Sequence, residues 1–474
     1  MIDAASWQPW AIVAAQGFAW FILAAGLLQL LFYLVQLAAA ALSLAEHPPV
    51  ASTSLLWERY GDLAPPIAVV APAYNEALTI VESVEALIAL QYPDFEVIVV
   101  NDGSRDRTLE VLIEHFRLKP VERLHETRLS HKPISGLFAS PEYPRLLVID
   151  KPNGGKADAL NAGINVARAP LVCGIDADTL LEPDSLLRVV RPFIEEPRTI
   201  AAGGTIRIAN GCVVQGGRVL RTSLSKNFLA LVQVVEYLRA FLMARLGLSR
   251  MGALLIISGA FGLFDRQAVL EAGGYSHGTV GEDMELVVKL HRLFRDRRQP
   301  YAITYVAEPV CWTEAPESLR ILASQRTRWQ RGALETFFRH RDMFLNPRYG
   351  RIGTIGFGQL FLVDVIGPVI EVVGYVLMPL LWALGLLSLD YLLAFIAMIF
   401  TFGVFVSVAT LILEEVELRR LSRARDLFVL TLISIAENFG YRQLCNFWRV
   451  KGFYQFLRKR QGWGEMTRLG FRRP

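Results

Sequence analysis

Two long apolar stretches, on either side of a block of ordinary composition, constrain this chain most. Residues 11–45 contain no charged side chain, and a second apolar region runs from about residue 352 to residue 413. About 20 consecutive apolar residues cross a bilayer as an α-helix. The composition agrees, because 53% of the residues are hydrophobic and only 20% are charged, which departs from the soluble average towards membrane proteins. We therefore expect a folded domain flanked by membrane-spanning helices.

The first apolar stretch predicts one long or tilted membrane helix, since no polar turn divides residues 11–45. A cleaved signal peptide is disfavoured, because no Lys or Arg precedes the run and the run is too long. Basic residues cluster in segments 339–351, 419–425 and 458–473. By the positive-inside rule, these clusters favour the cytosolic side of the membrane for the central block.

The second apolar region predicts one span within residues 352–389 and another within 391–413. The start of the former is expected to be interfacial, because Asp364 and Glu371 lie there. The last apolar piece, residues 427–448, leaves open an interfacial helix, a re-entrant segment or a third crossing. The expected regions are an N-terminal membrane helix at 1–45, a cytosolic domain at 46–315, interfacial helices at 316–351, membrane helices at 352–425, and an interfacial or membrane helix with a basic cytosolic tail at 426–474.

Charge and cysteine usage exclude other classes. The formal net charge of +4 is too small to argue for nucleic acid as a partner. The four cysteines are far apart, without CxxC or zinc-ligand spacing, and the seven histidines form no HExxH pair. We therefore expect free thiols in a reducing compartment.

Strand-like and helix-like segments alternate in the central block. Apolar runs that end in polar turns predict four strands, and helical patterns follow the first three. The runs are IAVVAPA from Ile67, FEVIVVND from Phe95, RLLVID from Arg145 and PLVCGID from Pro170. This order predicts an α/β fold with a mostly parallel sheet.

Polar residues follow the carboxyl ends of these strands, where open α/β sheets bind ligands. We expect Asn75 and Glu76, Asp102, residues 153–156, and Asp176 with Asp178 to converge on one crevice. An irregular insert between Phe116 and Leu146 is too long for an ordinary connection. A lid, a partner contact and a plain surface excursion all remain open for it.

Three ligand classes fit such a crevice to different degrees. A dinucleotide is disfavoured because the turn after the first strand reads APAYNEAL and lacks GxGxxG. ATP bound through a P-loop is disfavoured because NGGKAD lacks the full P-loop pattern. The third class is a nucleotide-sugar. Two carboxylates spaced Asp-x-Asp at a strand end can hold a divalent cation, Mg²⁺ or Mn²⁺, which bridges diphosphate oxygens. The alternative reading of Asp176 and Asp178 is a pair of acids near a helix N-terminus.

The ordered motifs from PAYNE at Pro72 to QRTRWQRG at Gln325 resemble family 2 glycosyltransferases of the membrane-embedded polysaccharide-synthase type. That group includes cellulose, chitin, hyaluronan and poly-N-acetylglucosamine synthases. The resemblance implies a nucleotide-sugar-binding, Rossmann-like domain of the GT-A type. It also implies a uridine diphosphate sugar as donor and a growing glycan as acceptor.

The resemblance implies roles for individual residues. Asp102 would contact the uracil, Tyr74, Asn75 and Glu76 would border the nucleoside, and Lys156 would lie near the diphosphate. Asp176 and Asp178 would match the metal and diphosphate motif, and Ser258 and Gly259 the segment that meets the acceptor sugar. Asp283 would match the general base, with Glu282 as the other acid of the pair, although Gly281 replaces the family's usual Thr. Gln325, Arg328 and Trp329 would match the Gln-x-x-Arg-Trp motif of the processive branch.

These residue types suit inverting transfer, in which a carboxylate takes a proton from the attacking hydroxyl. Arg328 can pair with diphosphate oxygens and Trp329 can stack on a sugar, although an interfacial helix would use both residues as membrane anchors. We expect a processive synthase, with N-acetylglucosamine favoured and glucose next. The membrane helices would form a path for the polymer, and a homo-oligomer or an accessory export subunit would complete it. The alternatives are a non-processive transferase that adds one sugar to a lipid-linked acceptor and an inactive membrane receptor.

Overall fold

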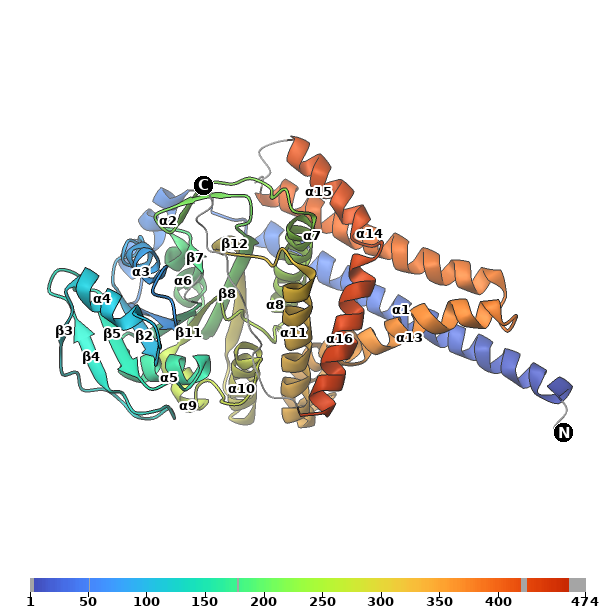
Figure 1. Ribbon diagram of the computed structural model, residues 1–474, viewed down its shortest axis with the longest axis horizontal. Helices are drawn as coiled ribbons and strands as arrows, with labels where there is room; N and C mark the ends of the chain where they lie inside the picture. The colour runs from blue at the N-terminus through green and yellow to red at the C-terminus, as the bar shows by residue number, and fades with distance from the viewer. Residues whose placement is uncertain (1–3, 51, 177–178, 419–423, 460–474) are drawn as a thin grey trace.

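The computed structural model describes residues 4–50, 52–176, 179–418 and 424–459. A sheet-based domain lies at one end of the molecule, and three long helices extend from its other side (Figure 1). Asp178, the basic segment 419–423 and the tail from residue 460 lie outside the described residues.

Four parallel strands form the centre of the sheet, in the order β5-β2-β1-β6. They are β1 (Ile67–Ala73), β2 (Phe95–Asp102), β5 (Leu146–Lys151) and β6 (Leu171–Ile175). Their apolar side chains are almost completely buried, as expected for strands covered on both faces. The prediction of an α/β fold built on these four strands is confirmed.

The rest of the sheet is mixed. Next to β6 lies β11 (Phe261–Asp265), which runs antiparallel to both β6 and β8 (Thr199–Ile208). Strand β8 pairs in parallel with β12 (Ala302–Thr313). The two edges carry the short strands β3 (Lys119–Pro120) and β4 (Gly136–Ala139) on one side and β7 (Leu180–Leu181) on the other. The long insert thus supplies one edge of the sheet.

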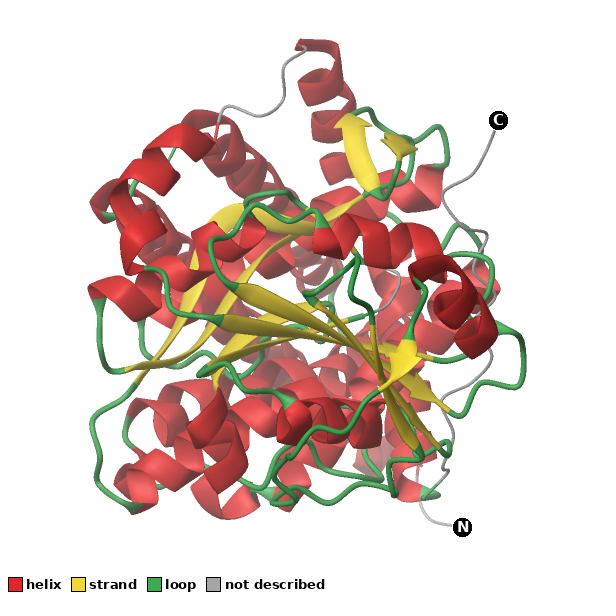
Figure 2. Ribbon diagram, turned by 90° about the vertical axis from the view of Figure 1, so that its left-hand side faces the viewer, coloured by secondary structure: helices red, strands yellow, loops and turns green. Residues whose placement is uncertain are grey.

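Helices cover both faces of the sheet (Figure 2). Their bounds are α2 (Thr53–Tyr60), α3 (Ile80–Ile88), α4 (Thr108–Phe116), α5 (Lys156–Val166), α6 (Ser185–Glu195), α9 (Arg266–Glu271) and α10 (Glu282–Asp296). Helix α5 is buried along most of its length, so its N-terminus is held firmly at the ends of the central strands.

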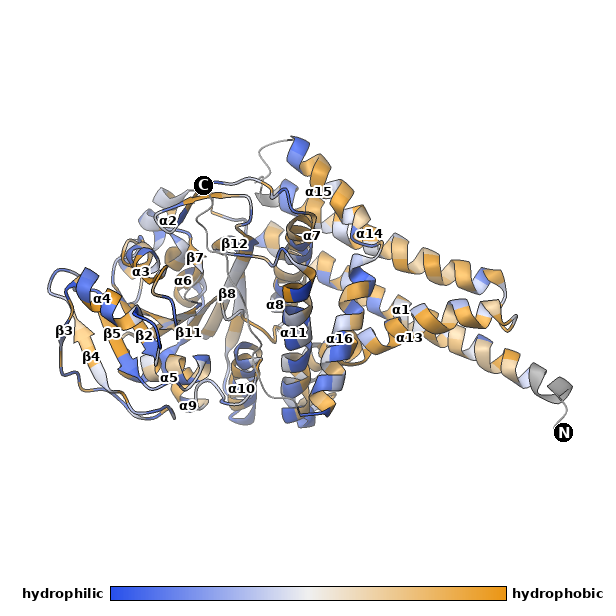
Figure 3. Ribbon diagram, viewed as in Figure 1, coloured by the Kyte–Doolittle hydropathy of each residue, from blue (hydrophilic) through white to orange (hydrophobic). Residues whose placement is uncertain are grey.

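The extended helices are α1 (Ala4–Glu46), α13 (Gly367–Ala383) and α14 (Leu389–Leu418). In the described part of the chain, three helical segments are long and apolar enough to cross a membrane: residues 9–46, 352–383 and 389–416. Their surface is predominantly apolar (Figure 3), and Trp10, Trp20 and Phe405 are exposed on it. The last apolar piece forms two further helices, α15 (Ala424–Ala436) and α16 (Tyr441–Leu457), neither of which is among the three.

Helix α11 (Leu319–Arg339) stands between the sheet and the apolar helices, with α16 beside it (Figure 1). The remaining helical segments nearby are α7 (Phe228–Tyr237), η2 (Leu238–Arg245), α8 (Leu246–Arg250), η5 (Ile352–Gly356), α12 (Phe357–Gln359) and η6 (Leu360–Ile366). Gln330 of α11 accepts a hydrogen bond from Arg449 of α16, which also pairs with Asp364 of η6 at 2.7 Å. This polar junction lies between the sheet-based domain and the apolar helices.

Candidate active site

Lys156 is the centre of a cluster of charged groups at the carboxyl ends of the strands. It opens α5, and its Nζ lies 2.5 Å from Asp176 Oδ1, directly after β6. The same Nζ lies 3.7 Å from Glu282 Oε1 and donates to the carbonyl oxygen of Gly259 at 3.4 Å. Residues that are distant in sequence therefore meet at one point, and the contact of Lys156 with Asp176 agrees with their predicted positions at the ends of neighbouring strands.

Gly259 lies between Lys156 and Asp283, where a side chain would displace the Lys156 amine. A β-carbon on Gly259 would lie 2.6 Å from Lys156 Nζ and 3.6 Å from Asp283 Oδ2. Its backbone N–H donates to Asp283 Oδ2 at 3.0 Å, while Met284 N–H donates to Oδ1 at 2.8 Å. These bonds fix the Asp283 carboxylate, which remains half-exposed at the start of α10. Ser258 precedes this contact and turns the chain towards β11.

The two acids at the start of α10 have different environments. Glu282 is buried, and burial raises its pKa. The positive charge of Lys156 lowers this pKa and the negative charge of Asp283 raises it, and the net shift is upward. Burial lowers the pKa of Lys156, but Asp176 and Glu282 raise it more, so that its pKa lies above the ordinary value. Asp283 is the more exposed of the two acids.

The carboxylates of this cluster suit a hard divalent cation, which prefers oxygen ligands. Glu282 Oε2 is buried and has no hydrogen-bond partner among the described residues, and Asp176 lies on the other side of Lys156. Within the described ranges, no three His, Cys, Asp or Glu side chains could hold a metal ion on their own. Asp178, the other acid of the predicted metal pair, lies outside the described residues.

Asp102 lies at the end of β2 and organises the loop that leads into α5. Its Oδ1 accepts from Lys151 Nζ and from Gly154 N (2.9 Å), and its Oδ2 from Gly155 N (2.7 Å) and the Asn153 side chain (3.2 Å). A carboxylate offers about four lone-pair sites, so these donors occupy them all. The predicted contact of Asp102 with a base would require one donor to give way, and Asn153 makes the longest of these bonds.

The turn after β1 is held against the start of α4. Asn75 has a left-handed backbone, with φ of 57°. Its side chain accepts from Arg105 N at 2.8 Å and its own N–H donates to Ser104 Oγ at 3.0 Å. Glu76 N–H donates to Thr108 Oγ1 at 2.9 Å, and Tyr74 is exposed. The turn at residues 74–76 thus packs against the segment that follows Asp102.

The Gln-x-x-Arg-Trp residues lie on α11. Gln325 and Arg328 share a helix face with Gly332 and Glu335, by their spacing of three and four residues. That face meets the loop before α10, because Glu335 Oε2 accepts from Thr279 Oγ1 (2.8 Å) and Val280 N (3.0 Å). The motif helix is therefore joined to the loop that leads into α10, where Asp283 lies.

Arg326 was not singled out by the sequence, although it lies inside the motif. Its guanidinium lies 4.2 Å from the centre of the Trp329 ring. It donates to Glu236 of α7, which also accepts from Tyr441 of α16, both at 2.7 Å. A basic residue three positions before a Trp on a helix was the available signal, since such residues stack. Lys151 was not singled out by the sequence either, because a single Lys at the end of a strand has no distinctive pattern.

Comparisons with known proteins agree with this geometry. The family model "Glycosyl transferase family 2" matches residues 68–271, and "Glycosyl transferase family group 2" matches residues 171–422, more than half of the chain. The poly-beta-1,6-N-acetyl-D-glucosamine synthase of Staphylococcus epidermidis is 30% identical over 266 residues, 56% of this chain and 54% of the relative. The synthase of the same description from Staphylococcus aureus (strain COL) is 30% identical over 272 residues, 57% of this chain and 55% of the relative. The chain thus matches about half the length of these curated relatives.

A solved structure shows the shared fold. The mannosyltransferase PcManGT from Pyrobaculum calidifontis, in complex with GDP-Man and Mn²⁺, aligns over 94% of this chain and 99% of its own, with a TM-score of 0.54 and 18% identity. The sheet-based domain is therefore of the GT-A type, and the fold class, the family and the enzyme class predicted from the sequence are confirmed. The chain belongs to the family 2 group of glycosyl transferases and is a glycosyltransferase.

Proposed function

We propose that this enzyme transfers a sugar, with inversion, from a uridine diphosphate donor to a growing β-linked glycan. N-acetylglucosamine is the favoured sugar and glucose the next, in line with the synthases that the chain resembles. The observation that carries the proposal is the convergence of Lys156, Asp176, Gly259 and Asp283 within one cluster at the strand ends.

Each group in this cluster has a chemical task in such a transfer. The Asp283 carboxylate, held by two backbone N–H groups, accepts the proton of the attacking hydroxyl as general base. Lys156 offers a cation to the departing diphosphate after exchanging its contact with Asp176. Mg²⁺ or Mn²⁺, held by Asp176 and Asp178, would supply positive charge that offsets the charge of the leaving diphosphate. Asp102 and the turn at Tyr74–Glu76 would receive the nucleoside.

The acceptor side of the proposal involves α11. Ser258 and Gly259 border the cluster, and Gln325 and Arg328 lie on the helix face that meets the Asp283 loop. Trp329 is 43% exposed, with Arg326 against its ring. A sugar face can stack on such an indole, because both surfaces are flat and partly apolar. Donor and acceptor would then meet between α10 and α11.

A cavity among the apolar helices supports export of the product. It has a volume of about 110 Å³ and lies between α1, α13, α14 and α16. Its polar lining residues are Gln29, Tyr33, Glu371, Tyr375, Arg442 and Gln443. Ionisable groups at membrane depth are costly and usually serve a path or a site, and a glycan cannot cross lipid without replacing its lost water contacts. We assign this cavity to the polymer path.

The membrane arrangement follows from the same proposal. The enzyme would be a multi-pass protein of the bacterial inner membrane, with its catalytic domain (residues 46–315) in the cytosol. The interfacial region at 316–351 would connect it to membrane helices at 1–45 and 352–425, and residues 426–474 would form an interfacial helix and a basic tail. A second copy of the chain, or an accessory export subunit, would complete the path.

The test is a donor panel with product sizing. Protein purified in detergent would be given radiolabelled UDP-N-acetylglucosamine, UDP-glucose and GDP-mannose separately, each with Mg²⁺ or Mn²⁺. A high-molecular-weight product from UDP-N-acetylglucosamine alone is the expected result. Product from another donor would change the sugar assignment. A single transfer, or turnover only with added lipid acceptor, would contradict processive synthesis and favour the transferase for lipid-linked acceptors.

A further inference from the structure

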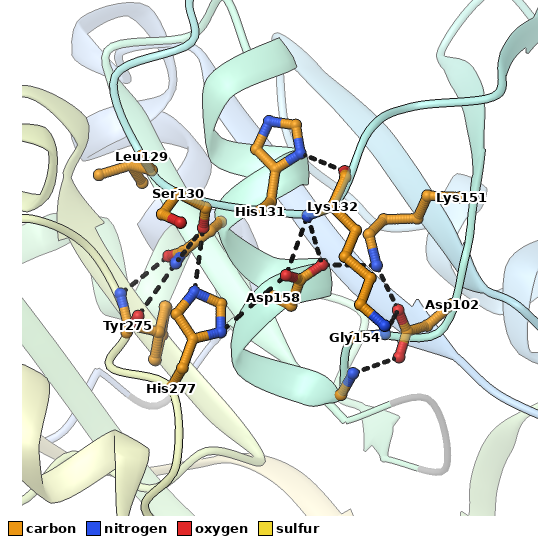
Figure 4. Close-up of polar contacts among 12 residues, drawn as sticks. Asp102, Leu129, Ser130, His131, Lys132, Lys151, Gly154, Asp158, Tyr275 and His277 are labelled. Atoms are coloured by element: carbon orange, nitrogen blue, oxygen red, sulfur yellow. Dashed lines mark hydrogen bonds and ion pairs between the residues drawn. The ribbon is translucent and has the colours of Figure 1, made fainter.

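Lys151, at the end of β5, is a fully buried cation that the proposed chemistry does not use. Its side chain is 0% exposed. Its Nζ pairs with Asp102 Oδ1, lies 2.6 Å from Asp158 Oδ1 and donates to the Pro152 carbonyl oxygen at 2.9 Å. An ammonium group has three donors, so these acceptors use all of them. Lys151 therefore joins two buried carboxylates through one fully satisfied group (Figure 4).

The first carboxylate, Asp102, fixes the loop that presents Lys156. Its oxygens accept from the backbone N–H groups of Gly154 and Gly155, the two residues that directly precede Lys156. Gly155 has φ of 91°, a backbone that favours glycine. The position of the Lys156 side chain in the charged cluster thus depends on the orientation of Asp102.

The second carboxylate, Asp158, holds the long insert. Its two oxygens accept from Lys132 N at 3.2 and 3.0 Å, and the Lys132 side chain donates back to the Asn153 carbonyl oxygen. His277 adds a bond to the Ser130 carbonyl oxygen at 3.1 Å and lies 3.9 Å from Asp158 Oδ2 (Figure 4). These bonds tie residues 130–132 of the insert to α5 and to the loop at residues 153–155.

Two asparagines of α5 fix the same stretch of the insert from below. Asn165 exchanges two hydrogen bonds with the backbone of Leu129, at 3.1 and 2.9 Å. Asn161 donates to the Ser130 carbonyl oxygen at 3.2 Å and exchanges bonds with the backbone of Tyr275. Residues 129–132 are consequently held in place by hydrogen bonds from α5 and the residues around Tyr275.

We propose that Lys151 is a positioning residue of the donor site, which locks Asp102 to the insert segment 129–132 through Asp158. The inference rests on the proposed nucleotide-sugar function. Without the Lys151 ammonium, two buried carboxylates would face each other uncompensated. Asp102 would turn from the loop, and both the loop and the insert segment would loosen. The nucleotide would then have to order this loop when it binds, and the entropy lost in that ordering weakens its affinity.

The test compares three variants of the full chain in detergent. Lys151→Met keeps the length of the side chain and removes its charge, and Asp158→Asn keeps the shape of its partner. Arg188→Met is the matched control. It removes a cation whose side chain is 14% exposed and which faces the buried Asp184 at the start of α6, outside the loop at residues 153–155. Binding of UDP with Mn²⁺ would be followed by calorimetry, donor KM and kcat by turnover, and the protection of residues 129–132 by hydrogen exchange.

We expect Lys151→Met to raise the UDP Kd and donor KM roughly tenfold, and to lower kcat as well, because the loop that presents Lys156 loosens. Asp158→Asn should raise the same constants, and both variants should exchange faster at 129–132, whereas Arg188→Met should do neither. An unchanged Kd and KM in folded Lys151→Met would overturn the inference, as would an equal rise in Arg188→Met. If the wild-type protein binds no UDP, both the donor assignment and the inference are rejected. Binding by the wild-type and Lys151→Met proteins alike would reject the inference alone.

Discussion

Gly281 and Gly332 pack backbone against backbone. A β-carbon on Gly281 would lie 2.9, 3.0 and 3.1 Å from the Cα, C and O atoms of Gly332. Gly281 is the residue before Glu282 and Asp283, and Gly332 lies on α11, seven residues after Gln325. This contact sets the distance between the acids and the helix of the Gln-x-x-Arg-Trp motif. No side chain fits at residue 281, because the Gly332 backbone is too close.

Substitution of Gly281 by Ala is expected to reduce activity strongly. The added methyl would press on backbone atoms, which cannot move aside as a flexible side chain does, and such overpacking costs about 1–3 kcal/mol. The loop would shift and carry Asp283 with it. We expect kcat to fall about tenfold or more, because small displacements of reacting groups are costly. Turnover and melting temperature would be measured together.

Gly358→Ala is the control for this substitution, because a β-carbon on Gly358 of α12 would meet nothing within 4 Å. It should leave both turnover and melting temperature close to those of the wild-type protein. Full turnover in Gly281→Ala would show that the Gly281–Gly332 contact does not position Asp283.

Asp283→Asn should abolish most of the turnover while donor binding survives. An amide of the same shape can still meet Gly259 N–H but cannot accept the proton, and loss of a general base costs about 10²–10⁴ in rate. The comparison is Asp296→Asn at the other end of α10, where the side chain is 36% exposed. Turnover of both variants would be measured at saturating donor, beside UDP binding. Near-normal kcat in Asp283→Asn would reject its assignment as base.

The sequence predicted the parts of the site that depend on local pattern. The four central strands were apolar runs ending in polar residues, and such runs are informative because a buried strand must be apolar on both faces. Lys156, Asp176 and Asp283 came from motifs at strand or helix ends. The meeting of Lys156 and Asp176 followed from the rule that parallel strands direct their carboxyl ends to the same edge, whereas Asp283 was named only through the family resemblance.

The contacts between distant segments could not be predicted. Strand β11 enters antiparallel, and this pairing depends on the whole path of the chain rather than on its five residues. The insert looked irregular because its order comes from Asn161 and Asn165, which bind its backbone from another element. Asn161 and Asn165, four residues apart in a helix whose other residues after Asp158 are apolar, were the one available signal, since a buried amide needs partners.

Stability should fall in mild acid because of His291. Its ring lies between the Tyr301 hydroxyl at 2.8 Å and the Leu254 carbonyl oxygen at 2.7 Å. Burial lowers its pKa from 6.5 to about 4. Between these values the unfolded chain binds a proton that the folded chain does not. The free energy of unfolding therefore decreases as pH falls from about 6.5 to about 4, by about 3 kcal/mol in total.

The His291 contribution would be isolated by comparing the melting temperatures of wild-type protein and His291→Gln from pH 7 to pH 4. The variant is expected to melt lower at pH 7, because it loses well-made bonds, and to lose less on acidification. An identical slope for both proteins across this range would mean that His291 is not the group responsible.

The cavity among the apolar helices gives the last prediction. Glu371 of α13 accepts from Tyr375 at 2.7 Å and from Asn446 of α16 at 2.6 Å, so it shapes the polar side of the proposed polymer path. Glu371→Leu would remove these acceptors and leave an apolar wall, while Glu371→Gln would keep a hydrogen-bonding group of equal size. Because the charged cluster around Lys156 is untouched, donor hydrolysis should persist in both variants.

Inverted membrane vesicles separate the two steps, since donor added outside reaches the cytosolic face and exported polymer collects inside. We expect Glu371→Leu to yield several-fold less polymer protected from an added glycan hydrolase, because sugar hydroxyls lose their partners along the path. Glu371→Gln should retain most of it. Equal amounts of protected polymer in Glu371→Leu and wild-type vesicles would exclude this cavity from the path, and would turn attention to a route formed between two copies of the chain.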